Sequence, residues 1–139
     1  MDSKEAHTYL EIAEDQLKDA ELALRGERYA LCALLSASCA ENAASALITT
    51  LGAKPSKRHR NSLVLNRLLL RATPKLKPGL RGMIESLKAL EPHITKARYP
   101  IRRGLELLPP SRFYTKEIAE KALAQAKDVV ENVKPLTKS

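Results

Sequence analysis

The stretch YALCALLSASCAENAASALITTL, residues 29–51, decides the fold. Its interior carries one charged residue, Glu41, and the other side chains are apolar or small nearly all round. A helix of this kind is buried on several sides, because it has no polar face to turn toward water. Its Ala, Ser and Cys residues let neighbouring helices approach closely, and Gly52 and Pro55 end it. The stretch predicts the central helix of a bundle.

Amphipathic helices on either side should cover this central helix. Apolar residues recur every three or four positions over residues 2–25 and again over 115–133, which places one apolar stripe on each helix. Shorter patterns over 63–72 and 78–90 predict two more helices, and no segment alternates in the manner of a strand. We therefore predict an all-α fold, an up-down bundle of about five antiparallel helices, in a single domain of residues 1–139.

Glu41 is the exception on the central helix. A carboxylate on a mostly buried helix needs a partner, because an unpaired buried charge is costly. We predict that Glu41 is a structural buried acid, paired with an arginine or a backbone amide of another helix, rather than a catalytic residue. Arg98 is one candidate for the partner.

The cysteines and the apolar runs bear on the compartment. Cys32 and Cys39 are seven residues apart, which is about 10 Å along a helix and too far for a disulfide. Both are therefore expected to be small buried hydrophobic residues of a cytoplasmic protein. Charged residues interrupt the N-terminal apolar pattern, and no apolar run reaches the 18 or so residues of a membrane span. We expect no membrane association.

The charge is concentrated in the middle of the chain. The net charge is +8, and residues 54–103 hold 14 Lys or Arg against two acids, Glu85 and Glu91. The remainder holds 10 basic and 14 acidic residues. A cationic region of this density attracts phosphate backbones and other polyanions. A basic surface that serves solubility or ion pairing is the alternative interpretation.

Two basic motifs carry the candidate binding site, KPSKRHRNS (54–62) and TKARYPIRRG (95–104). Arginine forks suit phosphate oxygens, and a tyrosine among them can stack on a base. The candidate nucleotide- or phosphate-binding residues are therefore Lys57, Arg58, His59, Arg60, Arg98, Tyr99, Arg102 and Arg103. Tyr99 can instead pack back on the bundle. The sequence shows no metal-ligand spacing, glycine-rich phosphate loop or nucleophile elbow, so we assign no metal, cofactor or catalytic residue.

Four segments together resemble the HEPN domain, a small helical domain found beside minimal nucleotidyltransferases in archaea and bacteria. They are AEDQLKDAELALRGERYALC (13–32), SCAENAASALITTLG (38–52), TKARYP (95–100) and FYTKEIAEKALAQAKDVV (113–130). The basic insert 54–62 resembles archaeal members. The resemblance implies an up-down helical bundle, homodimerisation, and a role near nucleotides or RNA.

Two features depart from the family pattern. Many HEPN proteins are metal-independent ribonucleases with an arginine followed, after four to six residues, by a histidine; no arginine here has a histidine at that distance. Ser45 stands where the family often has a lysine, one turn after the glutamate. We therefore predict a non-catalytic HEPN protein that binds nucleotide or RNA phosphate, as an accessory or toxin–antitoxin partner of a nucleotidyltransferase. A ribonuclease with a rearranged acid–base pair using His59 or His93 remains open, as does a protein–protein interaction module.

Overall fold

The computed structural model describes residues 3–71 and 77–137. The predicted all-α bundle is confirmed, with antiparallel packing. The helices of nine residues or more in the described chain are α1 (Ser3–Arg25), α2 (Tyr29–Thr50), α3 (Asn61–Leu69), α4 (Lys77–Leu90) and α7 (Lys116–Thr137). Two single-turn helices, α5 (His93–Lys96) and α6 (Pro110–Phe113), lie between α4 and α7. Ala72, the last residue of the predicted third helix, falls outside the described residues.

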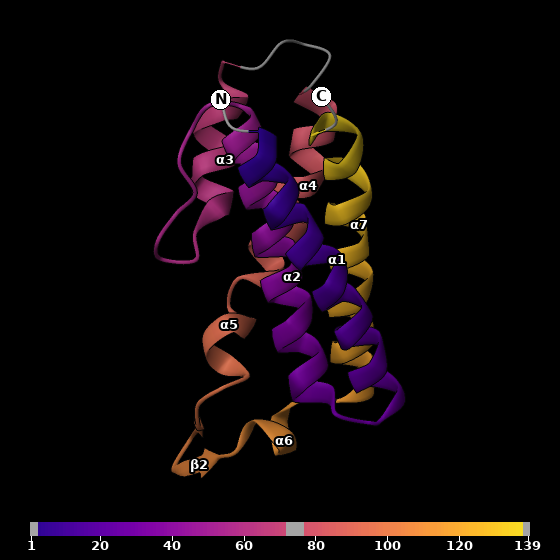
Figure 1. Cartoon of the computed structure of the whole chain (residues 1–139). Helices are drawn as coiled ribbons and strands as arrows, with labels where there is room; N and C mark the ends of the chain where they lie inside the picture. Colours follow the sequence, from indigo (N-terminus) through magenta and orange to yellow (C-terminus); the bar gives the residue numbers. More distant parts are fainter. Residues whose placement is uncertain (1–2, 72–76, 138–139) are drawn as a thin grey trace.

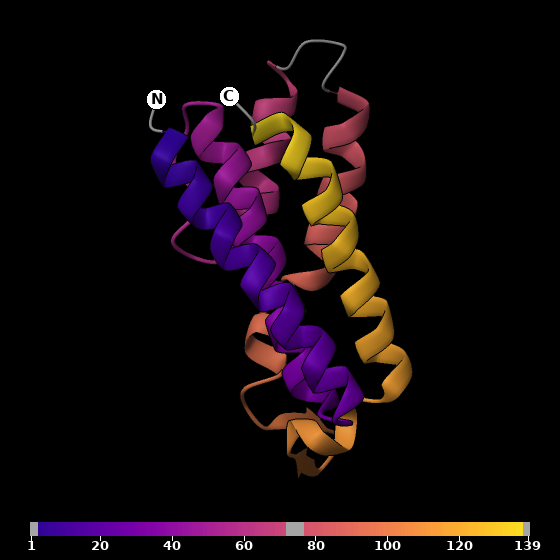
Figure 2. The same cartoon turned by 45° about the vertical axis from the view of Figure 1, so that its right-hand side comes forward.

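The three long helices α1, α2 and α7 lie side by side and give the molecule its elongated shape (Figures 1 and 2). α1 and α2 are joined by a tight turn in which Glu27 adopts a left-handed φ of 60°. α4 packs against α7 and α2, and α3 packs against α4 and α2. α2 therefore contacts helices on several sides, as its composition predicts.

The core is built on small side chains of α2. Thirteen of its 22 residues are buried, and alanine is the commonest type among them, which brings the neighbouring helices close. α2 is long and apolar enough to cross a membrane by length and composition, but 67% of that window is buried inside the bundle, which identifies it as the core helix. Cys32 and Cys39 are free and buried, as predicted, and burial raises the pKa of Cys39 to about 12.

The prediction that the chain has no strand is wrong at one place. Strands β1 (Ile101–Arg103) and β2 (Glu106–Leu108) form an antiparallel hairpin, in which Ile101 lies opposite Leu108. Gly104 begins the two-residue loop with a φ of 63°, a conformation that favours glycine. Three residues per strand are too few to show an alternating pattern in the sequence. The hairpin lies beyond α5, at the end of the bundle away from α3 (Figure 1).

Candidate functional site

The segment Lys54–Arg60, here called the basic loop, joins α2 to α3 and is tethered to α2 by one buried side chain. Asn61 is 1% exposed, and its Oδ1 accepts a hydrogen bond of 2.8 Å from the Ser56 N–H. Its Nδ2 donates to the Glu41 carbonyl and to the Ser45 hydroxyl, both at 3.0 Å. Three bonds from one amide therefore fix the base of the basic loop against the central helix.

The tip of the basic loop is held by a hydroxyl. Ser56 Oγ accepts hydrogen bonds from the backbone N–H groups of Arg58, at 3.0 Å, and Arg60, at 3.2 Å. Between them His59 adopts a φ of 58°, in the left-handed region that non-glycine residues rarely enter. Because these bonds use the backbone amides, the side chains of Arg58, His59 and Arg60 are left to extend from the loop.

Glu41 has a different partner from the one predicted. Its Oε2 lies 2.5 Å from Nδ1 of His59, and the two side chains are 21% and 50% exposed, so Glu41 is partly rather than fully buried. Arg98 does not reach Glu41: its Nε donates to the Ile94 carbonyl at 2.7 Å, and its guanidinium lies 5.3 Å from the centre of the Tyr99 ring. The reason is that the basic loop folds over this turn of α2, whereas Arg98 lies just beyond α5.

A second carboxylate, that of Glu91, caps the N-terminus of α3. Glu91, immediately after α4, accepts a hydrogen bond of 2.9 Å from the Ser62 N–H and one of 2.6 Å from the Ser62 hydroxyl. Arg60, the N-cap residue of α3, makes no side-chain capping bond. A negative charge at a helix N-terminus is favourable, because the exposed N–H groups carry partial positive charge. Glu91 thus joins the end of α4 to the beginning of α3.

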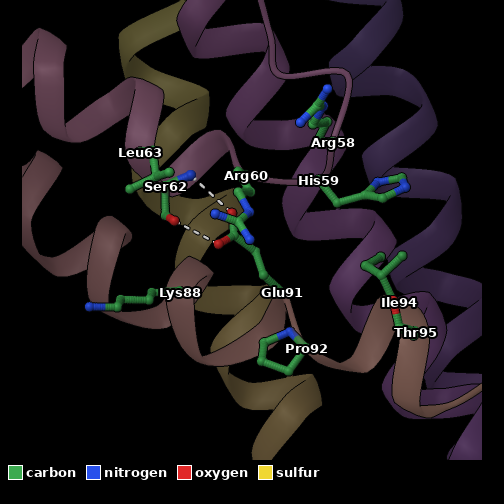
Figure 3. A pocket seen from close by; sticks show the side chains of 10 residues that line it. All are labelled: Arg58, His59, Arg60, Ser62, Leu63, Lys88, Glu91, Pro92, Ile94 and Thr95. Atoms are coloured by element: carbon green, nitrogen blue, oxygen red, sulfur yellow. Dashed lines mark hydrogen bonds between the residues drawn. The ribbon is translucent and has the colours of Figure 1, made fainter.

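These elements enclose an open pocket of about 480 Å³, here called the basic pocket (Figure 3). The basic loop, the start of α3 and the α4–α5 junction line it, and its polar lining includes Arg58, His59, Arg60, Ser62, Lys88 and Glu91. Within residues 3–71 and 77–137, the side chains of Arg58, Arg60 and Lys88 make no ion pair or hydrogen bond, whereas Glu91 is bonded to Ser62. The basic pocket therefore presents three cations without a carboxylate partner.

The structure brings together only part of the residues predicted for the site. Arg58, His59 and Arg60 line the basic pocket, and Lys57 lies exposed beside them. Thr95 is the residue of the 95–104 motif that reaches it. The other four candidates lie on the turn after α5 and on β1, outside the pocket lining; they are Arg98, Tyr99, Arg102 and Arg103.

Sequence reasoning did not propose Lys88, Ser62 or Glu91 as site residues, although all three line the basic pocket. Lys88 and Glu91 come from α4 and its end, so only the packing of α4 against α3 brings them to the basic loop. One signal was available for Glu91, because it is one of two acids in the basic region 54–103.

A second polar cluster lies near the α1–α2 turn and α6. Nδ1 of His93 lies 2.8 Å from the hydroxyl of Tyr114. Burial, and to a lesser extent the charge of Lys96, lowers the pKa of His93, and burial raises the pKa of Tyr114 to about 12. Tyr114 also lines another open pocket of about 500 Å³, together with Arg28 and Tyr29.

In the part of the chain described here, no three His, Cys, Asp or Glu side chains are grouped to hold a metal ion.

Comparison with known proteins identifies the family. The model of the HEPN domain matches residues 6–136, nearly the whole chain. The chain belongs to the HEPN family. Among relatives of this HEPN chain, a protein of Methanocaldococcus jannaschii named "Putative toxin MJ1304" is 31% identical over 137 residues, which cover 97% of this chain and 90% of the relative.

Two solved structures share the fold of this HEPN chain. The crystal structure of TT1696 from Thermus thermophilus has a TM-score of 0.73 and 25% identity, covering 94% of this chain and 97% of that one. The crystal structure of ST0689, described as an archaeal HEPN homologue, has a TM-score of 0.74 and 25% identity, covering 99% and 100%. The resemblance predicted from the four sequence segments is therefore confirmed.

Proposed function

We propose that this HEPN protein binds the phosphate groups of RNA or of a nucleotide in the basic pocket. The observation that carries the proposal is the set of cations in that pocket: among the described residues, Arg58, Arg60 and Lys88 have no carboxylate partner. Arginine presents a planar fork of donors that matches phosphate oxygens. The bonds that hold the basic loop also reduce the conformational entropy lost when a ligand orders it.

We further propose that the protein works in the cytoplasm, as a homodimer, with a nucleotidyltransferase as its toxin–antitoxin partner. The name of the relative from M. jannaschii supports a toxin-like role, and the family match supports the choice of partner. The burial of α2 inside the bundle fits a chain that needs no membrane.

The binding proposal predicts a ranking of paired substitutions. Arg58→Ala with Arg60→Ala should weaken binding of a short single-stranded RNA and lower the slope of log K against log salt by roughly 1.4, the value for two lost phosphate contacts. Arg102→Ala with Arg103→Ala, on β1, should have a smaller effect. Lys116→Ala with Lys121→Ala serves as the control. It removes the same charge from two exposed positions of α7 that do not line the basic pocket.

Fluorescence anisotropy across a salt series from about 50 to 300 mM measures these slopes. Equal losses in all three double variants would mean that RNA is attracted by overall charge rather than by the basic pocket. No binding of RNA or nucleotide by the unchanged protein at low salt would instead favour an interaction module with an acidic partner.

RNA cleavage at the same pocket is a second candidate function, favoured by the pairing of His59 with Glu41. A carboxylate at Nδ1 orients the imidazole and leaves the other ring nitrogen, Nε2, available for general acid–base chemistry. Cleavage of RNA in the presence of EDTA, followed on a gel, tests this candidate. Activity should be lost in His59→Gln and retained in His7→Gln. If the unchanged protein does not cut RNA, cleavage is ruled out as a function and binding is the function that is kept.

A further inference from the structure

We infer that Glu91 determines which phosphates the basic pocket accepts. Its carboxylate occupies the anion position at the start of α3, and thereby selects against doubly charged terminal phosphates and in favour of singly charged phosphodiesters. This inference rests on the proposed function, because it concerns the ligands of the same pocket.

The start of α3 is an anion position that is already filled. Both polar groups of Ser62 that point out of this helix end, the N–H and the hydroxyl, donate to the two oxygens of Glu91, at 2.9 and 2.6 Å (Figure 3). Helix N-termini of this kind bind phosphate when it is available. A ligand phosphate in the basic pocket therefore meets a carboxylate where it would otherwise find these donors.

The backbone holds Glu91 in this position from both sides. The Glu91 N–H donates to the Leu87 carbonyl at 3.0 Å, and the Glu91 carbonyl accepts a bond of 3.2 Å from the Ile94 N–H. Leu90 and Ile94, which flank it, are buried in the core. The ring of Pro92 fixes its own φ and restricts the backbone of Glu91, the residue before it. The backbone of Glu91 is therefore fixed at the α4–α5 junction, and the carboxylate itself is held by its two bonds to Ser62, both of which a ligand would have to break in order to displace it.

The consequence for a ligand follows from charge. A phosphodiester carries one negative charge, whereas a terminal phosphate carries nearly two at pH 7, because its second pKa is about 6. The first charge is met by Arg58, Arg60 and Lys88. The second charge approaches a pocket wall that contains Glu91, so its attraction to the cations is offset. At a separation of about 4 Å, an added unit charge changes affinity about fivefold in water, and more at the lower effective dielectric of a protein surface.

The test compares two ligands that differ in little but this charge, adenosine 5′-monophosphate and its methyl ester. Affinities are measured by NMR titration at about pH 7.5, above the second phosphate pKa. For the unchanged protein, the second charge should bring no gain in affinity over the ester. For Glu91→Gln, which keeps an oxygen to accept from Ser62, the monophosphate should gain about five- to tenfold relative to the ester.

The control is Glu85→Gln, which removes the same charge from an exposed position of α4 outside the basic pocket and should behave like the unchanged protein. The gain in Glu91→Gln should fade below about pH 6, where the phosphate takes up its second proton. A five- to tenfold preference for the monophosphate in the unchanged protein would overturn the inference, even if Glu91→Gln did not fold. An identical ratio of the two ligand affinities in the unchanged protein and in Glu91→Gln would also overturn the inference.

These failures are distinct from failure of the proposed function. If short RNA and both adenosine ligands leave the amide signals of the basic loop unchanged at low salt, the pocket binds no phosphate, and the proposed function and the inference both fall. If the RNA binds but the ratio of affinities for the monophosphate and its ester is the same with and without the Glu91 charge, only the inference falls.

Discussion

His93 illustrates how the surroundings of one side chain determine its charge. The imidazole is packed at the α5–α6 side of the bundle, with Nδ1 on the Tyr114 hydroxyl and the two rings edge to face at a centroid distance of 5.4 Å. Burial disfavours the protonated form and lowers the pKa of His93, and the nearby ammonium of Lys96 acts in the same direction. The neutral form is therefore the one that the fold accommodates.

This lowered pKa predicts a pH dependence of stability. The unfolded chain binds the proton near the ordinary histidine pKa of about 6.5, whereas the folded chain binds it only at lower pH. The free energy of unfolding should be highest above about pH 6.5 and fall as the pH decreases below it. Urea unfolding at a series of pH values measures this, and His93→Gln should reduce the slope. His7→Gln, at an exposed position of α1, should leave the slope unchanged; equal slopes in all three proteins would contradict the account.

At the scale of elements, the basic loop depends on the helix beneath it. The loop has no regular secondary structure, and its conformation comes from Ser56 and from the bonds that Asn61 makes to α2 and to the loop itself. Tethering of this kind makes a binding loop a rigid part of the bundle rather than a free linker.

Asn61→Ala should therefore have two effects. It removes the acceptor of the Ser56 N–H and the donor to the buried Ser45 hydroxyl, which costs about 1–3 kcal/mol of unfolding free energy. It also frees the loop, so RNA affinity should fall although no cation is removed. Urea unfolding and anisotropy measure the two effects. Asn66→Ala, at an exposed position of α3, should change the stability by less than about 0.5 kcal/mol. Unaltered stability and affinity in Asn61→Ala would show that Asn61 does not hold the loop.

The elements also show what periodicity can and cannot predict. The apolar stripes of α1 and α7 and the all-round apolar surface of α2 predict these helices correctly, because a core imposes a repeat over many residues. The hairpin has too few residues per strand for any repeat. In the site, composition points to Arg58 and Arg60, but the pairing of His59 with Glu41 requires a left-handed φ that the sequence does not reveal. Contacts across the bundle, such as Glu91 with Ser62, depend on tertiary packing alone.

At the scale of the whole molecule, stability and function depend on different parts of the chain. The surface ion pairs between α1 and α7, Lys134 with Glu14 at 2.9 Å and Lys127 with Glu21 at 3.7 Å, are substantially exposed, and pairs of this kind contribute little. Among the described elements, α2 supplies the largest share of the buried core residues. The basic region 54–103, with 14 cations against two acids, provides the long-range attraction for polyanions. Substitutions on the basic loop are therefore expected to change binding with little effect on the core.

The position of α2 in the chain has a consequence for synthesis on the ribosome. Residues 29–50 are complete long before residues 116–137, the helix α7 that lies against them. At elongation rates of about 5–20 residues per second, the nascent α2 waits on the order of ten seconds for that cover. When α2 is complete, only α1 precedes it; α3, α4 and α5, which cover other parts of α2, follow before α7. Until then, a helix apolar enough to enter a bilayer has the face that α7 covers open. The small alanine side chains keep that apolar surface modest, which limits how strongly chaperones or neighbouring nascent chains can hold it before the bundle closes.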